Sequence, residues 1–386
     1  MISDISCNQD QVSCFVELLK RDLPDPRDNR GKRHSLVFVI VAFVLATLTG
    51  RQRLSSIHRF ICHRLDWLHE LTQLPKGRSI SRAHLPRLLA RLDWSVLDQL
   101  IERCFGVRLQ NRDGQTWVAV DGKTLRGTLD AGEKQGLVVA ITHETREVVG
   151  QARQIGPNSS EIPVVRALLR ETGLEKQKVS LDAHPCNPKT TAPVHQAGGI
   201  YLTQVKENQA VLLRQCQTVA ESQSSMAETT EHDKAHGRVS TCRARLFAMP
   251  RMAPAPRWKT SGLTACVVVE RETFEVATRK TTAETSYYLS NQTIHVIAPQ
   301  ATVTELAQAI RRHWGVESNN WIRDVTFNED KIKTKSANQA QIMARLRSCA
   351  IALLRKASVK NLQAAIEQFA DSVADLESML RQVKFL

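Results

Sequence analysis

The chain has 386 residues, of which 42% are hydrophobic, so it is long enough for two or three domains with packed cores. Its formal net charge of +14 and pI of about 9.6 indicate a polyanionic partner, most commonly nucleic acid, although a generally basic surface is the alternative. Nine cysteines without a CxxC pair support neither a disulfide framework nor a zinc cluster, and the N-terminal segment lacks the layout of a signal peptide.

Residues 1–110 are predicted to form an all-α N-terminal domain. The apolar run from Leu36 to Leu48 ends near Gly50, a helix stop signal, and its 13 residues fall short of the roughly 20 that a membrane span needs. We therefore expect a buried helix there and no membrane association. Amphipathic helical segments follow at 57–71 and 83–105, and eight arginines lie between residues 51 and 91. The arginines indicate a DNA-binding module or, equally, the solvated faces of an ordinary helical bundle.

The pattern changes near residue 111, where short β-rich runs begin. Three strands are predicted in succession, then a helix with capping-box spacing from Asn158 to Glu161 and a stop at Gly173, then a strand, a short helix and a fifth strand. The order β-β-β-α-β-α-β predicts an α/β fold with a mixed five-stranded sheet that is covered by helices. The strand-like runs are 115–121, 136–145, 147–155, 178–183 and 199–206.

A β-rich insertion subdomain is predicted at residues 210–300, polar at first and then containing strand-like runs. A long helix follows, with capping-box spacing between Thr302 and Glu305. The rest of the chain, from about 337, is predicted to be helical. This division gives a folded core at 111–209 and 301–350, interrupted by the insertion, and C-terminal helices at 351–386.

Three carboxylates are candidates for a shared metal site. Asp121 and Asp182 each stand at the end of a predicted strand, and they would meet at one sheet edge if those strands are neighbours. Glu317 shares a helical face with His313 and Trp321, a setting suited to a metal ion, a phosphate and an unstacked base. Divalent cations bound by such oxygen ligands promote phosphodiester cleavage. The alternative to a metal site is that Asp121 and Asp182 are ordinary turn residues and that Glu317 forms an ion pair with a nearby cation. Spacing does not exclude four other carboxylates: Glu161, Asp324, Glu329 and Asp330.

Several of these segments resemble the DDE transposases of the H-repeat-associated insertion sequences (the IS-As type). The resemblance is carried by VAVDGKTLRG, KVSLDA, YLTQVKENQ and HWGVESNNWIRDVTFNED, while DPRDNRGKRHSLVFVIVAFVLATLTG resembles the N-terminal associated domain of that family. It extends from about residue 14 to the C-terminal helices. It implies an RNase H-like core with a β-rich insertion before the glutamate helix, and Asp121, Asp182 and Glu317 as metal-binding catalytic residues.

The sequence departs from related transposases around the glutamate. Related insertion-sequence transposases have a Y-R-E-K signature. In this chain the tyrosine, arginine and lysine positions of that signature are occupied by Ile310, His313 and Asp324, and the usual Glu-Asn pair is Glu317-Ser318. These changes leave the three carboxylates intact and transposition competence open. The candidate DNA contacts near the site are Lys123, Arg126, Lys206, Asn208, Arg312, His313, Trp321 and Arg323.

The resemblance implies a reaction without a covalent protein–DNA intermediate. Metal-activated water would release a 3′-hydroxyl at an element end, and this hydroxyl would attack target DNA. Two Mg²⁺ ions (or Mn²⁺ in their place) would bind each site, with Asp121 bridging them. The partners would be double-stranded DNA ending in inverted repeats and a second copy of the chain, in the cytoplasm of a bacterium at the nucleoid.

Other function classes remain open on the sequence. One is a catalytically silent or domesticated DNA-binding relative, and another is a metal-dependent nuclease that does not join DNA. A structural membrane-associated protein would rest only on the short 36–48 run. A tyrosine or serine recombinase is disfavoured, because none of the three tyrosines lies in a segment rich in arginine and histidine.

Overall fold

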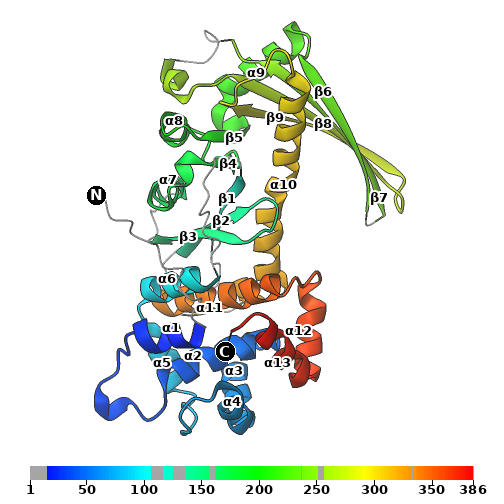
Figure 1. The fold of residues 1–386 in the computed structure, drawn as a ribbon. Coiled ribbons are helices and arrows are strands. Elements are labelled where there is room, and N and C mark those ends of the chain that lie inside the picture. Colours follow the sequence, from blue (N-terminus) through cyan, green and yellow to red (C-terminus); the bar gives the residue numbers. More distant parts are fainter. Residues whose placement is uncertain are drawn as a thin grey trace, which may run out of the picture.

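The computed structural model describes residues 15–105, 116–124, 135–155, 161–235, 237–250, 256–331, 334 and 336–385. A helical region lies below an α/β region that is built on one large sheet (Figure 1). The helices are α1 (Phe15–Asp22), α2 (Leu36–Leu48), α3 (Leu54–His63), α4 (Leu65–Thr72), α5 (His84–Arg91), α6 (Trp94–Phe105), α7 (Glu161–Thr172), α8 (Pro188–Gln196), α9 (Ala210–Ser222), α10 (Pro299–Val325), α11 (Ala337–Lys356), α12 (Leu362–Asp371) and α13 (Val373–Gln382). The strands are β1 (Trp117–Thr124), β2 (Gln135–Thr142), β3 (Val148–Ile155), β4 (Lys178–Leu181), β5 (Ile200–Val205), β6 (Ala227–Ala235), β7 (Arg238–Ala248), β8 (Ala265–Glu275) and β9 (Lys280–Ser290).

The sheet is mixed, with the order β3-β2-β1-β4-β5-β9-β8-β7-β6. β4 pairs in parallel with both β1 and β5, and the other pairings are antiparallel. The parallel pairs follow from the crossover helices α7 and α8, since parallel neighbours need such a connection. The mixed α/β class and the five predicted strands are therefore confirmed, in the order β3-β2-β1-β4-β5.

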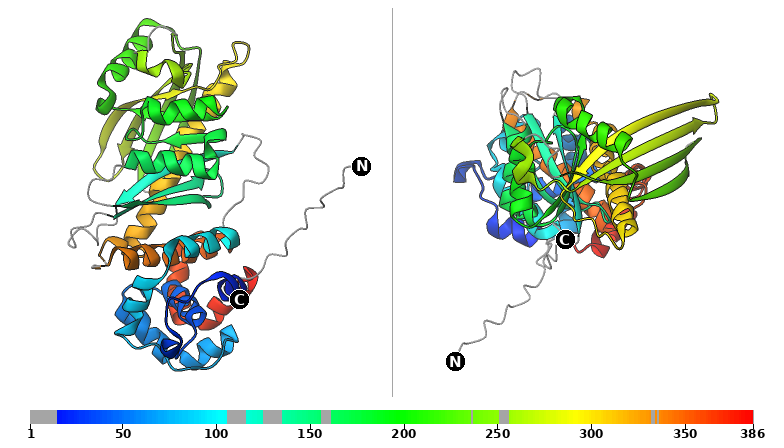
Figure 2. Two further views of the ribbon diagram at one scale, coloured as in Figure 1. Left: turned by 90° about the vertical axis from the view of Figure 1, so that its left-hand side faces the viewer. Right: turned by 90° about the horizontal axis from the view of Figure 1, so that it is seen from above.

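The β-rich character predicted for residues 210–300 is confirmed by β6 to β9, whereas the expected size of five strands for the sheet is corrected by the strand pairing. β9 pairs with β5, where Val205 faces Tyr287, so β9, β8, β7 and β6 extend the same sheet to nine strands. The polar start of this stretch holds α9 and β6. β6 is largely exposed on both faces, so its sequence carries no hydrophobic alternation. Strands β6 to β8 project beyond the body of the molecule (Figures 1 and 2).

Helices cover both faces of the sheet. One hydrophobic cluster joins Val118 and Val120 of β1 to α7, α8 and α9. On the opposite face, Ala119 packs with Val316 of α10, and α10 also packs on the extension strands through Leu306. The side chains of β1 alternate between the two clusters because successive strand residues point to opposite faces. The long α10 therefore covers one face of the sheet, and α7 and α8 lie on the other face (Figure 1).

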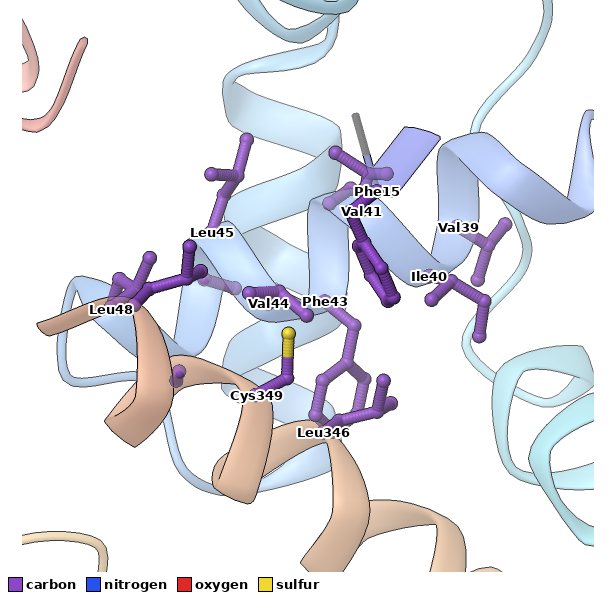
Figure 3. Close-up of a cluster of buried hydrophobic side chains, with 14 of the residues drawn as sticks. Phe15, Val39, Ile40, Val41, Phe43, Val44, Leu45, Leu48, Leu346 and Cys349 are labelled. Carbon is purple, nitrogen blue, oxygen red and sulfur yellow. The ribbon is translucent and has the colours of Figure 1, made fainter. Parts of the chain in front are cut away.

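Helix α2 is the centre of the helical core, as the apolar run predicts. Only Val37 of its residues is not fully buried, and Leu346 and Cys349 of α11 pack against it (Figure 3). The Ser35 Oγ caps the helix by accepting a hydrogen bond from the Phe38 N–H at 3.2 Å. No helix among the described residues is long and apolar enough to cross a membrane.

The C-terminal helices share this core with the N-terminal helices. α11 packs on α2, α5 and α6, and residues of α12 and α13 join the same hydrophobic cluster. The helical nature predicted for the chain from about residue 337 is confirmed. The domain boundaries at 110 and 350 stay predictions.

Two predicted helix starts have different outcomes. α10 begins at Pro299, because proline is well suited to the first helical position, so the capping box predicted at Thr302 is wrong. Glu305 instead accepts hydrogen bonds from Lys178 Nζ at 2.6 Å and from Trp117 Nε1 at 2.9 Å. α7 begins at Glu161, but Asn158 lies outside the described residues.

Candidate active site

Asp121 and Asp182 lie at the same edge of the sheet. β1 and β4 are parallel neighbours in which Val120 pairs with Leu181, and each aspartate directly follows one member of that pair. β1 continues to Thr124, so Asp121 lies inside the strand instead of ending it, whereas Asp182 directly follows β4. The expectation that the two strands are neighbours is confirmed.

The Asp121 carboxyl lies among other acids. Burial raises its pKa to about 7, with further contributions from the charges of Glu161, Asp182 and Glu317, while the Gly122 N–H acts in the opposite direction. A cation beside Asp121 would lower the pKa of this carboxyl, which would then lose its proton far more readily.

Glu317 approaches the same edge from α10. Burial and the charge of Asp182 raise its pKa, and the Lys206 ammonium opposes that shift. Lys206 Nζ lies 3.5 Å from Asp182 Oδ1. A small cavity of about 30 Å³ is lined by Asp182, Glu317, His313 and residues of β4 and β5. All three predicted carboxylates thus act on one another through their charges.

His313 is held by a buried hydrogen-bonded chain. The Ser180 hydroxyl lies 2.8 Å from His313 Nδ1 and 2.8 Å from His143 Nε2. Burial lowers the pKa of His143 to about 3 and that of His313 to about 4, so both imidazoles are neutral near pH 7. Within the described residues His313 Nε2 has no hydrogen-bond partner. His313 therefore acts as a neutral, oriented group.

Two further residues that sequence reasoning did not select belong to the site. A Cβ on Gly122 would lie 2.2 Å from the carboxyl carbon of Glu161, so this carboxylate lies over the backbone next to Asp121. Asn320 Nδ2 donates to Asp121 Oδ2 at 2.9 Å. Asn320 could have been found from its position one helical turn after Glu317. Glu161 was only one of four carboxylates with no distinguishing spacing.

The residues predicted to contact DNA differ in their exposure to solvent. Lys206 and Arg312 are exposed, Arg312 lies 3.5 Å from Glu144, and the Trp321 side chain is 60% exposed. Asn208 instead donates to the Ala183 carbonyl at 2.7 Å and so fixes the loop after Asp182. Arg126 lies outside the described residues.

Lys123 and Arg323 do not fit a role as phosphate contacts. The Lys123 side chain is 6% exposed and pairs with Asp324 and, at 3.3 Å, with Asp330. Arg323 is 1% exposed and lies 3.6 Å from Glu329. The two cations neutralise carboxylates inside the protein, where a phosphate has no access. Nothing in sequence spacing distinguishes such buried cations from exposed ones.

The donor set suits a hard divalent cation, although its members are not assembled around one point. Among the described residues no three His, Cys, Asp or Glu side chains lie close enough to hold a metal ion. Burial and the charges of neighbouring carboxylates nevertheless raise the pKa of Asp121 and that of Glu317, and a divalent cation would relieve this repulsion. Carboxylate oxygens are also the ligands that Mg²⁺ prefers.

Known proteins resemble the chain over most of its length. Residues 112–353 match the family model described as Transposase DDE domain, and residues 19–104 match the model described as DDE_Tnp_1-associated. "Putative transposase YncI" of Escherichia coli O157:H7 is 26% identical over 367 residues, or 91% of this chain and 90% of that protein. "H repeat-associated putative transposase YhhI" of Escherichia coli (strain K12) is 26% identical over 350 residues, covering 86% of this chain and 88% of the relative.

The first match includes β1 to β9, α10 and all three predicted carboxylates, and it spans more than half of the chain. This family implies a metal-dependent nuclease or transferase activity with DNA as the partner. The chain therefore belongs to the DDE transposases, the family that the sequence motifs around Asp121 and Glu317 predict.

Proposed function

We propose that this chain is the DNA transposase of an insertion sequence, with an RNase H-like core in which Asp121, Asp182 and Glu317 bind two Mg²⁺ ions. It would bind the terminal inverted repeats of its element in the bacterial nucleoid, as a homodimer on paired DNA ends. The observation that carries the proposal is the convergence of carboxylates from β1, the end of β4 and α10, where burial and then the charges of Glu161, Asp182 and Glu317 raise the pKa of Asp121 to about 7.

The proposed chemistry has two transfers at phosphorus. Water attacks a phosphodiester at the element end, which breaks the P–O3′ bond and leaves a 3′-hydroxyl and a 5′-phosphate. That hydroxyl then attacks a phosphodiester of the target, forming one P–O bond as another breaks. Bound Mg²⁺ would neutralise phosphate charge and favour deprotonation of the attacking hydroxyl or water.

The protein residues around the carboxylates would orient the reacting strand. Asn320 holds one oxygen of Asp121, which leaves the other oxygen for a cation. Lys206 offers a positive charge beside Asp182, where a phosphate would otherwise be repelled. The neutral His313, fixed through Ser180, presents Nε2 without adding charge to the site. The exposed Trp321 and Arg312 would contact bases and phosphates.

The test is cleavage of a DNA duplex that carries the ends flanking the gene. Asp121→Asn, Asp182→Asn and Glu317→Gln should each abolish Mg²⁺-dependent cleavage and leave DNA binding intact. Normal cleavage by Glu317→Gln would show that the third ligand is misassigned. A precut end with a free 3′-hydroxyl separates the functions further, because a nuclease that does not join DNA would fail to transfer it. Binding of the ends without cleavage by the wild type would indicate a silent relative.

A further inference from the structure

A groove separates α7 from α8 on the sheet face opposite α10. It has a volume of about 360 Å³. Its polar lining consists of Arg166, Arg170, Glu175, Lys189 and Thr190, and we refer to it as the α7–α8 groove. None of these residues is used by the proposed chemistry.

The charge of the groove is positive, with three cations and one acid in its lining. Arg166, Arg170 and Lys189 face a single acid, Glu175. Within the part of the chain that the structure describes, none of the three cations forms an ion pair with a carboxylate. Elsewhere in this protein, cations such as Arg243 and Arg311 are paired on the surface. The groove therefore concentrates positive charge that can bind an anion.

The interior of the groove also holds donors without acceptors. Thr190 is 1% exposed, and its Oγ1 has no hydrogen-bond partner among the described residues. Arg166 is half-buried, and its Nε atom also has no hydrogen-bond partner among the described residues. Buried hydroxyl and guanidinium donors are normally satisfied, so this pair points to an oxygen-rich ligand. A phosphate is a suitable acceptor for both groups, since its oxygens accept charge-assisted hydrogen bonds.

The groove begins next to the candidate active site. Pro163, which lines the groove, is two residues from Glu161, whose carboxylate lies over Gly122 beside Asp121. On the other side, α8 begins at Pro188, a few residues after Asp182. A nucleic-acid backbone that leaves the carboxylates can therefore continue between α7 and α8 without crossing the molecule.

We propose that the α7–α8 groove binds phosphodiesters of the DNA strand that passes through the active site, with Arg166, Arg170, Lys189 and Thr190 as its contacts. This inference rests on the proposed function, because it takes DNA as the substrate. The contacts are to the backbone, so they act on any sequence and strengthen binding without selecting the element end.

The experiment measures the salt dependence of DNA binding by the full-length chain, using fluorescence anisotropy with a duplex of arbitrary sequence. Each lost phosphate contact reduces the slope of log K against log salt by about 0.9. Arg170→Gln/Lys189→Gln should therefore lower the slope by about 1.8, so that the affinity lost between 50 and 200 mM salt shrinks about twelvefold. Arg170→Lys/Lys189→Arg should retain the wild-type slope. Lys280→Gln, at the exposed first residue of β9, is the matched control and should also retain it.

An unchanged slope in Arg170→Gln/Lys189→Gln would overturn the proposal. The proposal would also be overturned if Arg170→Gln/Lys189→Gln kept the DNA slope but was no longer stabilised by inorganic phosphate at constant ionic strength. The ligand of the groove would then be free phosphate. The binding assay is independent of cleavage. Asp121→Asn should bind with the wild-type slope, so a failure of the catalytic assignment does not alter this result. Thr190→Val, which keeps the shape, should weaken binding without changing the slope, and wild-type affinity would contradict its assigned contact.

Discussion

Replacing Lys123 tests whether this residue stabilises the fold or contacts DNA. Its ammonium lies between Asp324, Asp330 and Glu329, the last at 4.0 Å from Nζ. Burial lowers the pKa of Lys123, and the carboxylates act in the opposite direction. Lys123→Met keeps the length of the side chain and removes its charge. Three carboxylates then lose a shared partner.

The expected loss of unfolding free energy can be estimated from the exposure and the remaining partners of these carboxylates. Removing one partner of a buried ion pair costs about 3–5 kcal/mol. Glu329 keeps Arg347 at 3.1 Å and Arg323 at 3.6 Å, and Asp324 is partly exposed and can be hydrated. The loss should therefore lie near the lower end, at about 3 kcal/mol.

The assay is urea unfolding of the full chain, followed by tryptophan fluorescence, together with DNA binding under conditions in which the variant is folded. Lys123→Met should unfold at lower urea and bind DNA like the wild type. Lys280→Met, at an exposed lysine of β9, should change the unfolding free energy by less than about 0.5 kcal/mol. Unaltered unfolding combined with weakened DNA binding would refute the structural role and restore the DNA contact predicted from the sequence.

Three further substitutions follow from the site. The folded-state pKa of His143, near 3, is below its ordinary 6.5, so stability is present above pH 6.5 and falls as pH drops, by about 2 kcal/mol at pH 5. His143→Gln should make this loss measurably shallower in urea unfolding at pH 5 and 7.5, and equal pH dependence would contradict it. Asn320→Ala removes the 2.9 Å hydrogen bond to Asp121 and should raise the Mg²⁺ concentration for half-maximal cleavage about tenfold, whereas an unchanged titration would deny the positioning role. Gly122→Ala places a methyl group on the Glu161 carboxylate and should reduce cleavage while DNA binding persists; full activity would mean that Glu161 is dispensable.

Sequence patterns predicted the parts of the fold that depend on local or neighbouring segments. The parallel direction of β1 and β4 follows from two hairpins and the crossover helix α7, whereas the sequence left open whether the two strands are neighbours. The burial of Leu36–Leu48 follows from its length and uniform apolarity. The joining of β9 to β5 was missed, because antiparallel pairing between segments about 80 residues apart has no local signal.

The environment of individual polar side chains was the least predictable feature. Lys123 follows Asp121 by two residues and resembles a phosphate ligand, but its partner Asp324 is 201 residues away in the sequence. Arg323 is on the helix of Glu317 and yet points into the interior, where it meets Glu329. Burial of a cation is decided by tertiary partners, so the residue type alone predicts an exposed position in both cases.

Helix α2 is covered by helices from both ends of the chain, so its burial is complete only after the C-terminal helices have been synthesised. The helix is apolar on every side, and part of its cover, α11 and α12, is translated only after the entire sheet. Until then the nascent chain carries an uncovered apolar segment, a situation that favours aggregation or capture by a chaperone. A copy of the gene with a stop codon before residue 337 would therefore yield an aggregating fragment, and it would not release a free N-terminal DNA-binding module that competes with the intact protein for the element ends.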